Sequence, residues 1–132
     1  MERVKTIALN VAVAAIISLL LLWGATLYRQ HVQYEKGEQG MRAGNYPAAV
    51  AGYESAIHMY TPGSPLVESS AQKLWGLGQA MEGGGDVKGA LIAYRTLRSS
   101  FYAIAWIYSP GTEWIAKCDA KIAALVPKQQ GP

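Results

Sequence analysis

An uncharged, apolar run near the N-terminus limits how this chain can fold more than any other feature. From Ile7 to Leu27 there are 21 consecutive residues without Asp, Glu, Lys or Arg. A helix rises about 1.5 Å per residue, so this run would span about 30 Å, the thickness of a bilayer's hydrocarbon core. The sequence therefore predicts a transmembrane helix, with residues 1–28 forming a short basic tail and the span.

Two other interpretations of the run fit less well. A cleaved signal peptide has an apolar region of only about 7–15 residues and small residues at its cleavage site. Here Trp23 stands before Gly24 and Ala25, where a small residue would be needed. A buried core helix of this length without a charge would be unusual in a chain of 132 residues. The length of the run favours the membrane interpretation.

Basic residues flank the span on both sides, so their count is nearly balanced: Arg3 and Lys5 before it, and Arg29, Lys36 and Arg42 after it. Positive charge near a span favours the cytoplasmic side, and a short basic N-terminal tail is typical of an anchor with a cytoplasmic N-terminus. We expect a single-pass protein of the inner or plasma membrane. Its N-terminus would lie in the cytoplasm and its domain outside, in the periplasm if the source is bacterial.

One face of the span differs from the others. Asn10, Ala14 and Ser18 follow one another at intervals of four residues, which places them on one stripe of a helix. Small residues let helix backbones approach closely, and an amide in hydrocarbon favours a polar partner. The stripe predicts a packing face for an integral membrane partner. The alternative is that Asn10 is tolerated near the headgroups.

Two later segments, 44–56 and 85–97, repeat one another at an offset of 41 residues. Each starts with Gly followed by Asn or Asp, and each carries Ala and then Tyr at matching places: Ala49 and Ala90, Tyr53 and Tyr94. Gly can end a helix in the left-handed conformation, and Asn or Asp caps the next helix. The segments therefore predict two helical hairpins, with Ala where helices cross and Tyr between them.

This pattern resembles tetratricopeptide repeats, helix–turn–helix units of about 34 residues. The Gly of the family's first helix is matched by Gly37 and Gly78, and its Leu by Leu77. The resemblance covers about residues 30–100, with departures from the usual Trp, Tyr and Pro at Gln33, Leu74, Gly40, Met81 and Pro62.

The expected fold is all-α: one N-terminal transmembrane helix, then a short TPR-like helical-hairpin array of about two repeats with a closing helix. The array occupies residues 29–126, and residues 127–132 form a frayed tail. The span is expected to continue, with or without a break, into the first repeat helix. Pro and Gly residues break the chain between helices, which are predicted over about 29–43, 46–60, 66–82, 87–100 and 112–126.

The resemblance implies a groove that binds segments of other proteins, lined by the first helix of each unit. Its positions are Tyr34, Glu38, Met41, Arg42, Trp75 and Gln79, with His31, Gln72 and Glu82 beside them. The alternative is that Trp75 packs inside the domain. A further segment, 101–108, is apolar all round and contains Tyr102, Trp106 and Tyr108. It is either a buried helix extension or a surface for a partner or lipid.

The sequence offers no catalytic, metal or cofactor site. Basic residues are scattered, so a nucleic-acid interface is not expected. His31 and His58 fall on different helices without other ligands at metal spacing. The single cysteine, Cys118, is expected to be a core thiol. Gly83, Gly84 and Gly85 form a turn rather than a phosphate loop, since no Gly-Lys-Ser/Thr follows. We do not expect an enzyme.

These features favour an accessory or scaffold subunit of a membrane protein complex, held by its span and contacting a partner through the repeats. One alternative is a tethered assembly chaperone or receptor for soluble partners, whose span is only an anchor. Another follows from residues 98–102 and 110–115, which look similar to small proteins encoded beside proton-channel motors of the TolQ/ExbB kind.

Overall fold

Five helices make up the part of the chain that the computed structural model describes, residues 1–106 and 109–129. They are α1 (Glu2–Arg42), α2 (Tyr46–His58), α3 (Leu66–Gly83), α4 (Val87–Ala103) and α5 (Thr112–Gln129). The expected all-helical class is confirmed. The span and the first domain helix are one continuous helix, α1.

The turns after α1 and after α3 are built alike. Gly44 and Gly85 have φ angles of 70° and 83°, the left-handed conformation that glycine adopts without steric cost. The next residue caps the following helix: Asn45 Oδ1 accepts from the Ala48 amide at 3.2 Å, and Asp86 Oδ1 accepts from the Gly89 amide at 2.8 Å. The predicted helix ends and caps are confirmed at both turns.

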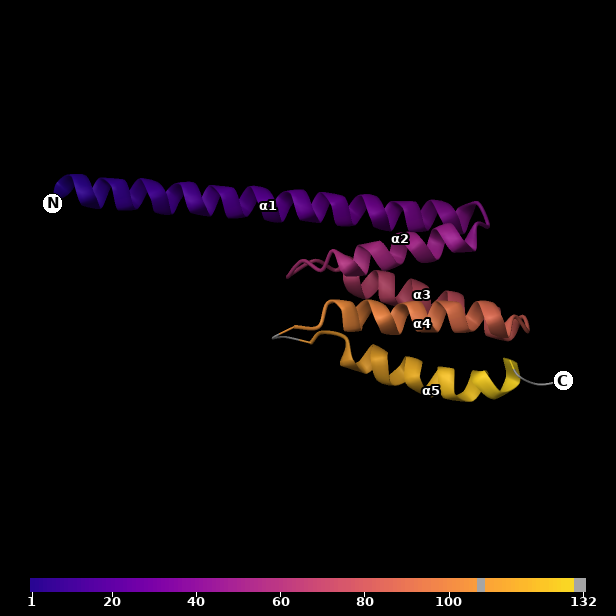
Figure 1. Cartoon of the computed structure of the whole chain (residues 1–132). Coiled ribbons are helices and arrows are strands. Elements are labelled where there is room, and N and C mark those ends of the chain that lie inside the picture. Colours follow the sequence, from indigo (N-terminus) through magenta and orange to yellow (C-terminus); the bar gives the residue numbers. More distant parts are fainter. Residues whose placement is uncertain (107–108, 130–132) are drawn as a thin grey trace.

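The helices α2 to α5 lie beside the C-terminal half of α1 and alternate in direction, whereas the N-terminal half of α1 projects alone (Figure 1). Each helix packs chiefly against its neighbours in sequence. The α2–α3 and α4–α5 loops lie at the end of the domain that faces the projecting half of α1. The α1–α2 and α3–α4 turns lie at the opposite end (Figure 1).

The core is made by buried apolar side chains from α2 to α5, and Tyr34 of α1 packs against it. Tyr53 and Tyr94 are fully buried, and each ring fills the space left by a glycine on the preceding helix. A Cβ on Gly37 would lie 2.7 Å from the Tyr53 ring, and one on Gly78 would lie 2.6 Å from the Tyr94 ring. The last helix, α5, covers the end of the stack with buried Trp114, Cys118 and Leu125.

The last helix continues through Pro127 to Gln129, beyond its predicted end at Val126. A proline removes one helical N–H and so deprives the carbonyl of Ala123 of its partner. Ala123 is exposed, so water can supply the missing bond. The nearby Leu125 is buried, which holds the last turns against α4. Residues 127–129 of the expected frayed tail are therefore helical, and residues 130–132 lie outside the described range.

Candidate membrane and partner surfaces

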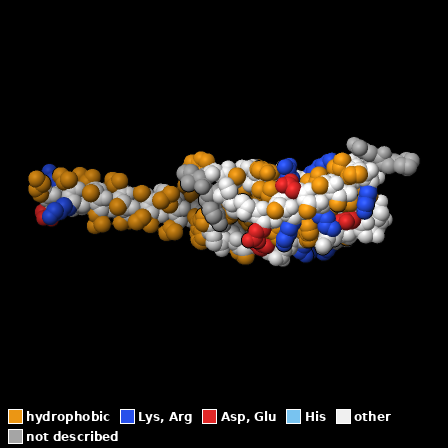
Figure 2. Space-filling model, turned by 90° about the horizontal axis from the view of Figure 1, so that it is seen from below, with side chains coloured by type: hydrophobic (Ala, Val, Ile, Leu, Met, Phe, Trp, Pro, Cys, Tyr) orange, Lys and Arg blue, Asp and Glu red, His pale blue; other side chains and the backbone are white. Residues whose placement is uncertain are grey.

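The projecting half of α1 is an uncovered apolar rod. Every residue from Met1 to Ala25 is exposed. The helix is long and apolar enough to cross a membrane, and the most apolar 18-residue window has a mean hydropathy of 2.4 with no residue buried. Figure 2 shows hydrophobic side chains along the whole projection and charged ones only near its tip, whereas the domain surface carries both signs of charge.

The predicted packing face of the span, Asn10, Ala14 and Ser18, lies wholly on this projecting half. All three residues are exposed. No residue from the described part of the domain covers them, since α2 to α5 pack beside the other half of α1. The face thus remains a prediction, available to a partner outside this chain.

The α2–α3 loop fixes the junction between the two halves of α1. The indole Nε1 of Trp23 donates to the carbonyl of Pro62 at 3.4 Å. Gln30, the first fully buried residue of α1, donates from Nε2 to the carbonyl of Ala56 at 3.0 Å. Its Oε1 accepts a hydrogen bond from the Ser64 hydroxyl. The domain is therefore attached beside the end of the apolar run, with no linker between them.

On α1, the predicted groove residues divide into packed and exposed ones. Tyr34 is half-buried and meets Tyr53 edge-on, with ring centroids 5.6 Å apart. Glu38 accepts a hydrogen bond from the Tyr53 hydroxyl at 2.7 Å and pairs with Lys73 at 3.3 Å. The Tyr53 hydrogen bond in particular lowers the pKa of Glu38. Met41, Arg42 and His31 are exposed, and Arg42 makes only a surface ion pair, 3.8 Å from Glu35.

On α3, Trp75 is turned inward. Its ring is half-buried, 5.1 Å from the Tyr94 ring and 6.0 Å from the Trp114 ring. Gln79 and Gln72 are exposed. A depression of about 430 Å³ brings Met41 and Gln72 together, with Gly76 and Ala80 also lining it. Of the predicted groove residues, only Met41 and Gln72 line this depression, and Trp75 belongs to the domain packing.

Contacts between α3 and α5 include two charged groups that the sequence did not single out, Lys121 and Glu68. Lys121 Nζ pairs with Glu82 at 3.1 Å, and this bond is the largest cause of the lowered pKa of Glu82. The indole Nε1 of Trp114 donates to Glu68 Oε2 at 3.0 Å. Opposite charges on two helices are a sequence signal, but only the packing decides which charges meet.

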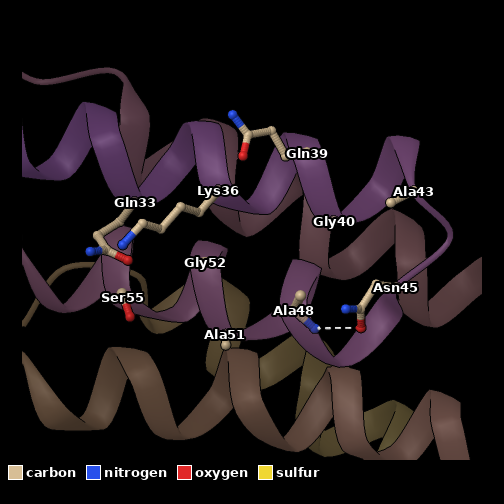
Figure 3. A pocket seen from close by; sticks show the side chains of 10 residues that line it. All are labelled: Gln33, Lys36, Gln39, Gly40, Ala43, Asn45, Ala48, Ala51, Gly52 and Ser55. Atoms are coloured by element: carbon tan, nitrogen blue, oxygen red, sulfur yellow. Dashed lines mark hydrogen bonds between the residues drawn. The ribbon is translucent and has the colours of Figure 1, made fainter.

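A second hollow that the sequence did not predict runs between α1 and α2. It has a volume of about 450 Å³ and is drawn in Figure 3. Small residues of both helices lie beside longer polar side chains; the lining is Gln33, Lys36, Gln39, Gly40, Ala43, Asn45, Ala48, Ala51, Gly52 and Ser55. Gly40 and Gly52 let the two backbones come close, because a Cβ at either position would overlap backbone atoms of the other helix.

The aromatic segment 101–108 begins in the last turn of α4, and its described residues are split between core and surface. Phe101 is buried and Ile104 packs partly against the core. Tyr102 is 52% exposed and Trp106 is 84% exposed, the latter a high value for so large an apolar side chain. The interpretation as a wholly buried helix extension is therefore wrong for these two residues. Tyr108 lies outside the described residues.

Neither Cys118 nor His58 is placed for chemistry. Cys118 is buried, as predicted, and burial raises the pKa of its thiol to about 11. A thiol with so high a pKa is a poor nucleophile at neutral pH. His58 lies 3.9 Å from Glu54 on the same helix. Among residues 1–106 and 109–129, no three His, Cys, Asp or Glu side chains are grouped to hold a metal ion.

No protein-family model, curated protein or solved structure matches this chain. Its function must therefore be argued from its own residues. The surfaces available for a function are the apolar half of α1, the hollows of the domain, and the exposed side chains of Tyr102 at the end of α4 and Trp106 in the α4–α5 loop.

Proposed function

We propose that this chain is a membrane-anchored, TPR-like protein-interaction subunit, an accessory or scaffold component of a membrane protein complex. The observation that carries the proposal is the uncovered apolar half of α1, joined without a break to a folded helical domain. In water such a rod would expose apolar side chains over its whole length, at a cost of about 25 cal/mol per Å². The proposed place is the inner or plasma membrane, with the N-terminus in the cytoplasm and the domain outside.

The TPR-like character is supported by the matching contacts of the two hairpins. In each, a glycine of the first helix receives the ring of a tyrosine from the second. In each, that tyrosine also contacts an aromatic residue at the same position of the first helix: Tyr34 on Tyr53, and Trp75 on Tyr94. Domains of this kind bind other proteins through the surface formed by their first helices. Here that surface would include the depression beside Met41 and Gln72.

Gentle detergent extraction of the tagged protein, followed by mass spectrometry of what purifies with it, tests the proposal. We expect an integral membrane protein in a fixed ratio. The double substitution Asn10→Leu with Ser18→Leu should remove it, because larger apolar side chains would hold the backbones apart. Ala8→Leu with Ala12→Leu is the matched control. Those residues are centred about 140° around the helix from the Asn10 face, so the control should keep the partner.

Two results would speak against this function. If only soluble proteins purify with the chain and the Asn10/Ser18 variant keeps them, the span is only an anchor and the protein is a tethered chaperone or receptor. If no protein purifies with it in a fixed ratio, the subunit proposal fails. Loss of the partner from both double variants would assign the interaction to the span as a whole and not to the Asn10 face.

A further inference from the structure

The α4–α5 loop lies at the same end of the domain as the junction with the apolar half of α1. Hydrogen bonds along this end of the domain connect α1 to the α2–α3 loop and α3 to α5. Trp23 is bonded to Pro62 of the α2–α3 loop, and Glu68 in the first turn of α3 is bonded to Trp114 in the first turn of α5. In Figure 1 the α2–α3 loop and the described residues of the α4–α5 loop lie at the end of the domain that faces the projecting half of α1.

The position of Trp23 sets the level of this end relative to a bilayer. Trp23 lies four residues before Leu27, the last residue of the uncharged run, or about 6 Å along the helix. Trp is enriched where hydrocarbon meets headgroups. The first charge after the run is Arg29, at the depth where a headgroup region would begin. A domain attached here without a linker must rest its loop end on the membrane surface.

The two loops lack charged residues, as expected for a surface that contacts a membrane. Between Glu54 and Glu68, and again between Arg98 and Glu113, the chain has no Asp, Glu, Lys or Arg. The turns at the opposite end of the domain lie next to Arg42, Asp86 and Lys88. Trp106 projects from the uncharged end with 84% of its surface exposed, beside exposed Ala105. Placing that indole among the headgroups would remove its apolar surface from water and leave its N–H free to donate.

We propose that the described part of the α4–α5 loop, with the exposed indole of Trp106, inserts into the headgroup region of the bilayer that holds the span. This inference rests on the proposed membrane location of α1. The domain would then have two membrane contacts, the span and this loop, so that it could not swing about the junction. The partner is the lipid interface itself, because the described part of the loop and the end of the apolar run lie at the same end of the stacked helices.

Spin labels on the full chain in phosphatidylcholine vesicles test the inference, with relaxation by oxygen reporting lipid and relaxation by a water-soluble nickel complex reporting water. Labels would be attached at Leu19→Cys in the span, Ala105→Cys in the loop and Ile92→Cys on the exposed side of α4. Cys118 is buried with a raised pKa, so unsubstituted protein serves as the blank for labelling. The vesicles contain no other protein, so any lipid contact belongs to this chain.

The ratio of relaxation by oxygen to relaxation by nickel should be high at position 19 and low at position 92. At position 105 it should lie between the two, because the headgroup region is shallower than the hydrocarbon core. Adding Trp106→Ser should lower the oxygen-to-nickel ratio at position 105 several-fold and leave the other two unchanged. If position 19 reports lipid and position 105 behaves like position 92, the loop lies in water and the inference is wrong while the span stands. If position 19 itself reports water, both the span and the docked loop are wrong.

Discussion

The two halves of α1 are one helix, yet they depend on different surroundings. From Met1 to Ala25 every residue is exposed, and within the described part of the chain only Trp23 of this stretch forms a hydrogen bond to the domain. From Gln30 to Arg42 the helix is part of a core, with Gly37 and Gly40 pressed against α2. Although α1 is one continuous helix, only its second half is expected to fold and unfold together with the domain. A change in the second half should unfold the domain, whereas the same change in the first should not.

The largest contrast is expected between two glycines. A Cβ on Gly52 of α2 would overlap the backbone nitrogen of Gly37 on α1, whereas a Cβ on Gly24 has nothing within 4 Å. Backbone atoms cannot rotate away, so Gly52→Ala should destabilise the domain by about 3 kcal/mol. That corresponds to a fall in Tm of about 12 °C or more for a domain of this size. Gly24→Ala should leave the Tm unchanged. Thermal unfolding in detergent, followed by near-ultraviolet circular dichroism, measures both; equal Tm values would contradict the comparison.

Two amides of the same helix provide the next contrast. Gln30 is fully buried and satisfies the carbonyl of Ala56 and the hydroxyl of Ser64. Replacing it by Ala leaves those groups without this partner, at a cost of about 2 kcal/mol. Asn10→Ala should have no effect on unfolding of the domain, because Asn10 lies on the projecting half. Chemical denaturation monitored by tryptophan fluorescence measures the difference, and a Gln30→Ala midpoint equal to that of Asn10→Ala would show that the junction is not built as described.

The hydrogen bond from Tyr53 to Glu38 is confined to the packed half. Tyr53→Phe should cost about 1.5 kcal/mol at neutral pH, the lower range for a bond to a charged acceptor. Because this bond lowers the pKa of Glu38 in the folded state, its contribution is present above the ordinary pKa of a glutamate and is lost as pH falls through the lowered value. The two proteins should therefore converge in stability in acid.

Unfolding of the wild type and of Tyr53→Phe across the acid range measures this convergence, with Glu38→Gln as the control. The Gln variant cannot titrate at that position, so its own loss of stability in acid should be smaller than that of the wild type. A constant difference between wild type and Tyr53→Phe at all pH values would mean that Glu38 is not the acceptor that matters.

The smallest effect is expected where the two halves meet. Trp23 is 48% exposed, and its bond to Pro62 is long, at 3.4 Å. Trp23→Phe keeps an aromatic ring and removes the donor, so the domain should lose about 0.5 kcal/mol or less. A loss comparable to that of Gln30→Ala would show that the apolar half supports the domain and would weaken the division of α1 into two units. Denaturant midpoints of the two variants give the answer.

Much of the local structure was readable from the sequence. The capped turns at Asn45 and Asp86, the helix breaks and the burial of Cys118 were all predicted correctly. These features follow from interactions between residues close together in the sequence. A glycine adopts a positive φ, a cap side chain accepts a hydrogen bond from the amide three residues later, and apolar residues recur at helical spacing. The partner-binding groove stays a prediction, and of the two interpretations of Trp75 the structure favours packing inside the domain. Trp75 faces inward to Trp114, a residue 39 positions away that no local pattern connects to it.

By itself, the sequence determined that this chain is helical, that one run is apolar over the thickness of a bilayer, and that two hairpins are constructed alike. These follow from charge, spacing and backbone conformation, which act over a few residues. Only the tertiary structure decided that α1 is unbroken, that Glu38 pairs with Lys73, and that the uncharged loop with Trp106 lies at the same end as the apolar run. Those outcomes depend on how antiparallel helices stack, which brings together residues far apart in the chain.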